Sequence, residues 1–282
     1  FIFNKQRELS VKVAILDMYN DKPGQHGMRC LHDILREYAP EAEVSVFNVR
    51  AKVEIPDLSY DLYISSGGPG DPTEYDERWS DKYFNFIDQL EQWNKQHIDS
   101  PKYLFAICHS FQLLCAHKRI GAITARKKFS FGVTAIRKTD DGKTDDLLKH
   151  FDEVFYAADH RYFQVVDPDF SKIEEADIHI LAKEECNDDN SEDSLMVVRF
   201  SPHIIGTQFH PEVDVLGMKD TITKENIRLE VEKVFGKGRL VRIQKDINDP
   251  QKIDKMYHTL LPQFIHLCKE TKAGIPVNEP MI

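Results

Sequence analysis

The sequence predicts an α/β protein with a mostly parallel central sheet flanked by helices. Short apolar runs, typical of buried strands, alternate with longer segments in which apolar residues recur at helical spacing. Clusters of turn-forming residues separate these segments, most densely from Gly67 to Pro72. Alternating strands and helices are typical of a doubly wound sheet with helices on both faces.

The first half of the chain supplies most of this alternation. An apolar run that ends in Asp17 predicts the first buried strand, and Pro40 closes the helix that follows. Four strands are expected here, at residues 11–17, 44–49, 60–66 and 102–107. Three helices are expected between or after them, at residues 28–38, 79–93 and 109–120.

The pattern changes towards β-structure from about Phe129 and becomes helical from Thr221 onward. The polar stretch 184–193 predicts a solvated hairpin loop. The last helix is expected to have Asp249 as its N-cap and to run to about Lys269, with Pro262 as a kink or break. The chain is therefore expected to be one domain, with a core over about 11–215 and a helical extension over about 216–282. The later strands are expected at residues 130–137, 153–157, 178–182, 195–200 and 204–208.

Composition excludes several classes of protein. The 282 residues are 41% hydrophobic, which argues against general disorder, and no apolar run is long enough to span a membrane. The net charge of −10 argues against a nucleic-acid partner. Five scattered cysteines without a C-x-x-C pair argue against a disulfide framework or a zinc site. We expect a reducing, cytoplasmic setting, since no signal-peptide pattern opens the sequence.

Cys108 stands directly between an apolar strand and a helix. A residue on such a turn projects from the carboxyl edge of the sheet, where open α/β folds bind ligands. The start of the helix favours negative charge and hence a thiolate. Taken alone, the same pattern also fits a core cysteine.

Two other segments follow apolar runs. His210 and Glu212 are two residues apart, so on an extended segment their side chains point to the same side and could form a base with its orienting carboxylate. The glycines of Gly67–Pro72 allow close backbone approach and leave an N–H free for a developing oxyanion. Individually these remain consistent with a surface pair and a turn.

Together the three segments resemble the class I, triad-type glutamine amidotransferases, the ammonia-generating modules of enzymes such as GMP synthase. Gly67–Pro72 is similar to the family's oxyanion loop, Ala106–Gln112 to its nucleophile turn, and His210–Glu212 to its late H-P-E. Residues 129–133 and 159–165 resemble two further family segments. The resemblance covers about residues 11–215 and implies a flavodoxin-like three-layer sandwich.

The resemblance also implies roles for individual residues. Cys108 is the expected nucleophile, His210 the base and acid, and Glu212 the group that orients His210. The backbone N–H groups of Gly68 and His109 would form the oxyanion hole. The expected substrate contacts are Gln112 and the main chain around Phe131 and Gly132. For His160 two roles are considered, one at the edge of the substrate pocket and one purely structural. No cofactor and no metal site are expected.

Three positions depart from the family pattern. Ala106 and Ser110 replace glycines of the nucleophile turn, which puts activity in doubt although both are small. Asp159 stands where the family has serine, and this change is expected to alter the pocket or the partner-facing surface.

The expected reaction is hydrolysis of the glutamine side-chain amide through a γ-glutamyl thioester, with ammonia delivered to an acceptor. Too few residues follow the core to form a synthetase module, so the acceptor is expected on a partner subunit. Two alternatives stay open: a γ-glutamyl hydrolase or peptidase with the same triad, and a non-catalytic regulatory subunit. The extension, with Ile222, Ile227 and Val231, could pack on the core, cover the site or dock a partner.

Overall fold

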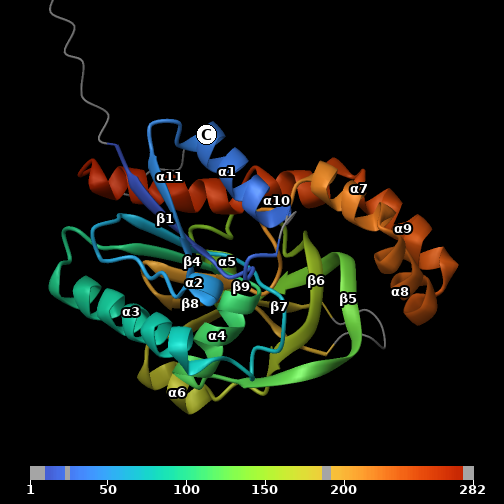
Figure 1. The fold of residues 1–282 in the computed structure, drawn as a ribbon, viewed down its shortest axis with the longest axis horizontal. Helices are drawn as coiled ribbons and strands as arrows, with labels where there is room; N and C mark the ends of the chain where they lie inside the picture. The colour runs from blue at the N-terminus through green and yellow to red at the C-terminus, as the bar shows by residue number, and fades with distance from the viewer. Residues whose placement is uncertain (1–9, 23–25, 186–191, 276–282) are drawn as a thin grey trace, which may run out of the picture.

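The computed structural model describes residues 10–22, 26–185 and 192–275. Within these residues the chain folds into an α/β sandwich with additional helices at one end (Figure 1). The strands are β1 (Lys12–Asp17), β2 (Glu43–Asn48), β3 (Leu62–Ser65), β4 (Tyr103–Ile107), β5 (Ala122–Lys138), β6 (Val154–Val166), β7 (His179–Glu184), β8 (Leu195–Ser201) and β9 (Ile204–Thr207). The helices are α1 (His26–Tyr38), α2 (Val49–Lys52), α3 (Glu77–Gln96), α4 (His109–Lys118), α5 (Asp140–Thr144), α6 (Phe170–Glu175), α7 (Val215–Thr223), α8 (Glu225–Phe235), α9 (Lys237–Ile247), a π-helical turn η1 (Pro250–Asp254), α10 (Lys255–Tyr257) and α11 (Leu260–Lys272).

The strands form one sheet in the order β2-β1-β3-β4-β9-β8-β7-β5-β6. Strands β2, β1, β3, β4 and β9 are parallel, whereas β8, β7, β5 and β6 continue the sheet with antiparallel pairings. The α/β class is therefore confirmed, and the sheet is mixed. The carboxyl ends of β4 and β9 lie side by side, which brings the two segments that follow them, at Cys108 and His210, to one edge.

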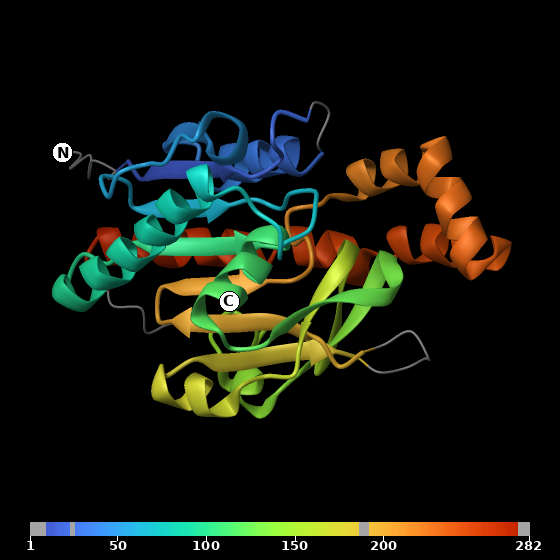
Figure 2. The same cartoon turned by 60° about the horizontal axis from the view of Figure 1, so that its bottom comes forward.

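Helices cover both faces of the parallel half of the sheet (Figure 2). Val13 and Ile15 of β1 point to the face covered by α1 and α11, and Ala14 and Leu16 point to the face covered by α3 and α4. Both faces are buried, which explains why β1 is a continuous apolar run rather than an alternating one. Part of the predicted extension is thus a core element, because Leu260, Phe264 and their neighbours in α11 complete one layer.

The other part of the extension packs elsewhere. Helices α7, α8 and α9 lie beyond the β5–β6 hairpin, at the right of Figure 1. Their apolar side chains form a separate cluster with Phe129 and Phe131 of β5 and Ala158 of β6. This arrangement places the three helices over the end of the sheet where Phe131 lies.

Some element boundaries differ from the predicted ones. Strand β5 begins at Ala122 rather than Ser130, because an irregularity between Ala125 and Ser130 hides the alternation across a basic stretch. Strand β6 continues to Val166, well past the predicted end at residue 157. Residues 186–191 of the predicted hairpin loop 184–193 lie outside the described residues.

The predicted final helix is split. Asp249 is an N-cap as expected, with its side chain accepting from the Gln251 N–H, but the helix breaks between Tyr257 and Leu260. Pro262 then lies in the first turn of α11. A proline ring collides with the carbonyl four residues earlier, here that of His258, so the break precedes the proline instead of falling on it.

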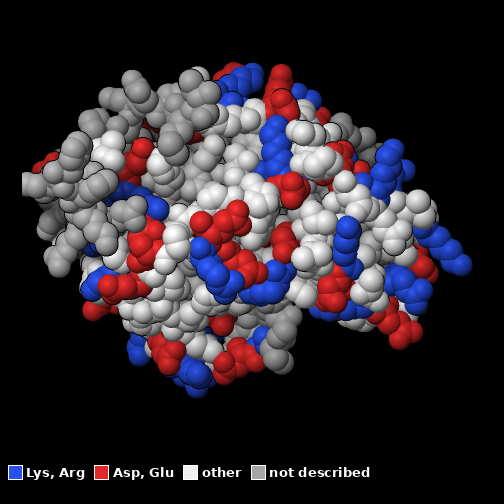
Figure 3. Space-filling view, turned by 90° about the horizontal axis from the view of Figure 1, so that it is seen from above, with Lys and Arg blue, Asp and Glu red and all other residues white. Residues whose placement is uncertain are grey.

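The surface carries charges of both signs. On the face shown in Figure 3, acidic and basic side chains are interspersed rather than gathered in one basic patch. Among the described helices, none is both long and apolar enough to cross a membrane. Cys30, Cys108, Cys115 and Cys268 are free thiols, and Cys186 lies outside the described residues.

Candidate active site

Cys108 occupies the sharp turn between β4 and α4. Its backbone has φ 48° and ψ −99°, an unfavourable conformation for a residue with a side chain. The Cys108 N–H donates to the carbonyl of Thr207 at the end of β9, at 2.7 Å. The strained turn is therefore tied to the neighbouring strand β9, and the side chain is 6% exposed at the edge of the sheet.

His210 and Glu212 follow β9 and form a hydrogen-bonded pair. The His210 Nδ1 lies 2.9 Å from Glu212 Oε1, so Nδ1 carries the proton and Nε2 is left to face another group. The His210 N–H donates to the Ala158 carbonyl of β6 at 2.9 Å, which fixes the segment. The Glu212 side chain is buried, with 1% exposure.

The electrostatics of this pair favour an imidazolium. Burial by itself lowers the pKa of His210, but the charges of Glu212 and Cys108 and a hydrogen bond to each raise it well above its ordinary value. A protonated His210 beside Cys108 is the charge arrangement that stabilises a thiolate.

The loop Gly67–Pro72 passes close to the end of β1. A Cβ on Gly68 would lie 2.5 Å from the Met18 carbonyl oxygen, so only glycine allows this approach. The Arg50 guanidinium donates to the Met18 carbonyl at 3.1 Å and to the Pro69 carbonyl at 2.6 Å. Arg50 thus ties the loop to β1. The sequence analysis did not identify Arg50, because its two partners lie 19 and 32 residues away in the sequence and such distant contacts leave no local pattern.

Ser110 is buried in the turn after Cys108, at a position where the family pattern has glycine. Its Oγ donates to the Ser66 carbonyl at 2.6 Å and lies 2.8 Å from the Oγ of Ser65. Ser65 also lies 3.0 Å from the Tyr83 hydroxyl. The buried serine is therefore satisfied by polar partners and links α4 to the start of the loop Gly67–Pro72.

Gln112 lies on α4 and reaches Gln208, a residue without an assigned role in the sequence analysis. The Gln112 Nε2 donates to Gln208 Oε1 at 3.1 Å, and the Gln208 Nε2 lies 3.8 Å from Cys108 Sγ. Gln208 is fully buried. Its place two residues before His210, in the same short segment, is the signal that could have identified it.

The remaining predicted residues lie in different surroundings. The His160 ring meets the edge of Phe131 at 5.2 Å between centroids, and burial lowers the pKa of His160. Gly132 has φ +118°, and a Cβ there would lie 2.9 Å from Cγ1 of Ile243 in α9. The His109 side chain is 2% exposed, and its burial lowers its pKa to about 3.

One cavity of about 410 Å³ brings most of the predicted residues together. It is bounded by Tyr19, by the loop Gly68–Gly70, by residues 158–163 of β6, and by α7 and α8. Glu212, His109 and Gly132 do not line it. The predicted residues that do line it are Gly68, Cys108, Gln112, Phe131, His160 and His210.

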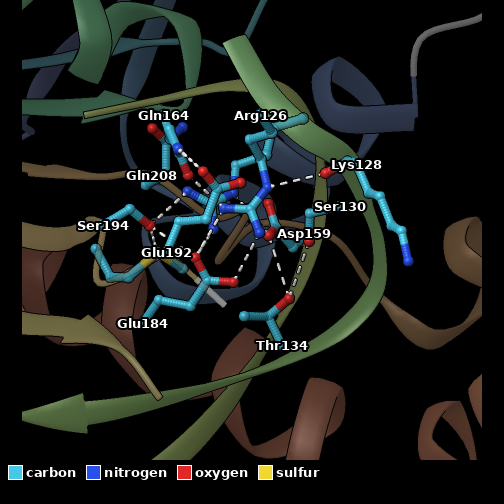
Figure 4. A network of polar contacts seen from close by, with 12 residues as sticks. Arg126, Lys128, Ser130, Thr134, Asp159, Gln164, Glu184, Glu192, Ser194 and Gln208 are labelled. Carbon is cyan, nitrogen blue, oxygen red and sulfur yellow. Dashed lines mark hydrogen bonds and ion pairs between the residues drawn. The ribbon is translucent and has the colours of Figure 1, made fainter. Parts of the chain in front are cut away.

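A buried network of charges lies beside this cavity (Figure 4). Arg161 contacts Asp159 at 2.9 Å and Glu184 at 2.8 Å, and Arg126 contacts the same Glu184 at 2.8 Å. All four side chains are less than a tenth exposed. Opposite charges at these separations offset the cost of removing each from water.

No site for a metal ion is apparent in residues 10–22, 26–185 and 192–275, where no three His, Cys, Asp or Glu side chains lie close enough to hold one.

Solved structures with the same fold include several glutamine amidotransferases. A glutamine amidotransferase from Thermotoga maritima matches with a TM-score of 0.60 at 18% identity, covering 92% of this chain and 98% of that one. One from Methylobacillus flagellatus matches with a TM-score of 0.60 at 14% identity, covering 97% and 98%. The glutaminase domain of Trypanosoma brucei CTPS, solved with acivicin bound, matches with a TM-score of 0.53 at 14% identity, covering 79% and 94%. These likenesses confirm the fold.

Sequence comparison identifies the family. No curated protein sequence gives a significant match. The family profile described as glutamine amidotransferase class-I matches residues 27–229, which include the nucleophile turn, the H-P-E segment and helix α7. This chain therefore belongs to the class-I glutamine amidotransferase family.

Proposed function

We propose that this protein hydrolyses the side-chain amide of glutamine and that Cys108, His210 and Glu212 carry the reaction. The observation that supports this most strongly is the strained Cys108, with φ 48°, facing the same cavity as a histidine that is hydrogen-bonded to a buried carboxylate. A thiol, a base and an orienting group in this order are the components of a cysteine-dependent acyl transfer.

In the proposed reaction, the Cys108 sulfur attacks the amide carbon of the substrate. The negative charge that develops on the amide oxygen is stabilised by the backbone N–H groups of Gly68 and His109. His210 then gives its proton to the departing nitrogen, so that ammonia leaves and a γ-glutamyl thioester remains. Water, deprotonated by His210, releases glutamate and restores the thiol.

The ammonia acceptor lies on a partner subunit in this proposal. Family membership supports glutamine amidotransferase activity, in which the released ammonia passes to an acceptor. The loop Gly67–Pro72 is the element through which such a partner would act, since its backbone supplies one of the proposed oxyanion donors.

Labelling with a diazo-ketone analogue of glutamine tests the proposal directly. We expect a single adduct by intact mass, suppressed by glutamine and absent in Cys108→Ala, because only the activated thiol reacts. Cys115→Ala is the matched control: it removes another buried thiol of α4 and should be labelled like the unmodified protein. Equal labelling of Cys108→Ala would contradict the mechanism. Absence of labelling, with turnover of γ-glutamyl peptides, would favour a γ-glutamyl hydrolase.

A further inference from the structure

Asp159 lies at the part of the cavity where the α-carbon end of the substrate is expected. It stands on β6 directly opposite Gly132 of β5, in the register that also places His160 opposite Phe131. Asp159 is one of the residues that line the same cavity as Cys108 and Gln112. Asp159 is therefore one register position away from Phe131, which also lines the cavity and whose main chain the sequence analysis assigns to the substrate's amino-acid group.

Only one of the two carboxylate oxygens of Asp159 is satisfied by the protein. Oδ2 accepts from Arg161 Nε at 2.9 Å and from the Thr134 hydroxyl at 3.1 Å. Oδ1 has no hydrogen-bond partner among the described residues. Because Asp159 is only 1% exposed, this oxygen is also shielded from water. A buried carboxylate oxygen without a hydrogen-bond donor raises the free energy of the folded protein. A ligand that donates a hydrogen bond to it would recover that free energy on binding.

The charge of Asp159 suits a cationic ligand group. Burial, the largest single effect, raises its pKa, but the Arg161 guanidinium, a hydrogen bond from Ser130 and the charges of Arg126 and His210 together lower it, so Asp159 is ionised at neutral pH. Arg161 also forms an ion pair with Glu184, so its positive charge is divided between Asp159 and Glu184.

We propose that Asp159 is a specificity-determining residue whose Oδ1 binds the α-ammonium group of the substrate. This inference rests on the proposed function, because the amide of glutamine must reach Cys108 while its ammonium reaches Asp159. It assigns to a side chain a contact for which the sequence resemblance offers only Gln112 and main-chain atoms. The proposal also explains why an aspartate stands at position 159, where the family pattern has serine.

The experiment compares two probes and three variants. The probes are a diazo-ketone glutamine analogue and its α-deamino form, which lacks only the ammonium group. The variants are Asp159→Asn and Asp159→Ser, which remove the charge, and Thr134→Val, which removes a donor to Oδ2 and leaves Oδ1 unchanged. The second-order rate constant of labelling is measured by intact mass, and circular dichroism checks the fold of each variant.

We expect the unmodified protein to react faster with the amino probe. In both Asp159 variants the rate with the amino probe should fall about tenfold or more, as for a lost hydrogen bond to a charged group. The rate with the deamino probe should stay within about twofold, as should the probe preference of Thr134→Val. An unchanged preference in the Asp159 variants, or an equal fall with both probes, would overturn the assignment. If the unmodified protein reacts with neither probe, the proposed function itself fails.

Discussion

Cys108 shows how the surrounding fold holds a single residue in an unfavourable backbone conformation. Its positive φ costs about 1–3 kcal/mol, and it persists because β4, β9 and α4 fix the backbone on both sides. The same constraint directs the thiol to the cavity shared with His210. A residue of this kind is recognisable from sequence, since an apolar strand that ends in Cys and continues as a helix is a local pattern.

The pKa of His210 gives a prediction for Glu212→Gln. Because the folded pKa of His210 is raised, its contribution to the free energy of unfolding is complete below about pH 6.5 and is lost as pH rises through the folded value. Removing the Glu212 charge lowers that pKa, so the variant should lose less stability than the unmodified protein above pH 6.5. Urea unfolding of both proteins across this pH range measures the free energy of unfolding, and an identical dependence on pH in the two proteins would contradict the prediction.

Glu212→Gln should also keep more glutaminase activity than Cys108→Ala, because in the proposed reaction Glu212 orients His210 and does not itself react.

At the scale of elements, the parallel strands and their helices follow closely from the sequence. Their signals are local: a buried strand is a continuous apolar run, and a covering helix shows its apolar stripe. The β5–β6 hairpin was less predictable, since a strand irregularity depends on the neighbouring strand. For the same reason Arg50 and Gln208 gained a role in the site only from the fold. Pro262, by contrast, already predicted a kink or break, because its clash with the His258 carbonyl is local, and the structure added only where the break falls.

Arg50 provides a test of how the loop Gly67–Pro72 is held. We expect Arg50→Met to lower kcat by about tenfold, because two carbonyl contacts that fix the loop are lost and the proposed oxyanion donor becomes less well placed. KM should change less, since Arg50 does not line the cavity. Arg78→Met is the control, an exposed arginine at the start of α3 whose ion pair with Asp76 lies at the surface. If both variants behave alike, Arg50 has no special role in the loop.

Across the whole molecule, the helices after residue 215 serve two parts of the structure. Helix α11 completes a layer of the sandwich, whereas α7 and α8 bound the cavity through Met218, Thr221 and Ile227. A hydrogen bond between His26 and Asp220 and an ion pair between Arg29 and Asp214, each at 2.7 Å, tie α7 to α1. The sequence predicted helices with apolar faces here. It could not show which surface those faces cover, because that depends on where β5 and β6 lie.

Ile243→Ala tests whether these helices belong to the site. Ile243 of α9 is 1% exposed and packs against Gly132, so the truncation should lower the free energy of unfolding by about 2–5 kcal/mol and loosen α7–α9 from β5. The proposed catalytic residues follow β4 and β9, away from α9, so kcat should change little, while KM for glutamine should rise as the cavity wall becomes mobile. Val241→Ala, at a residue of the same helix that is 68% exposed, should alter neither quantity. Urea unfolding and glutaminase kinetics on both variants separate the cases: a loss of stability without a rise in KM would mean that α7–α9 support the fold but take no part in binding the substrate.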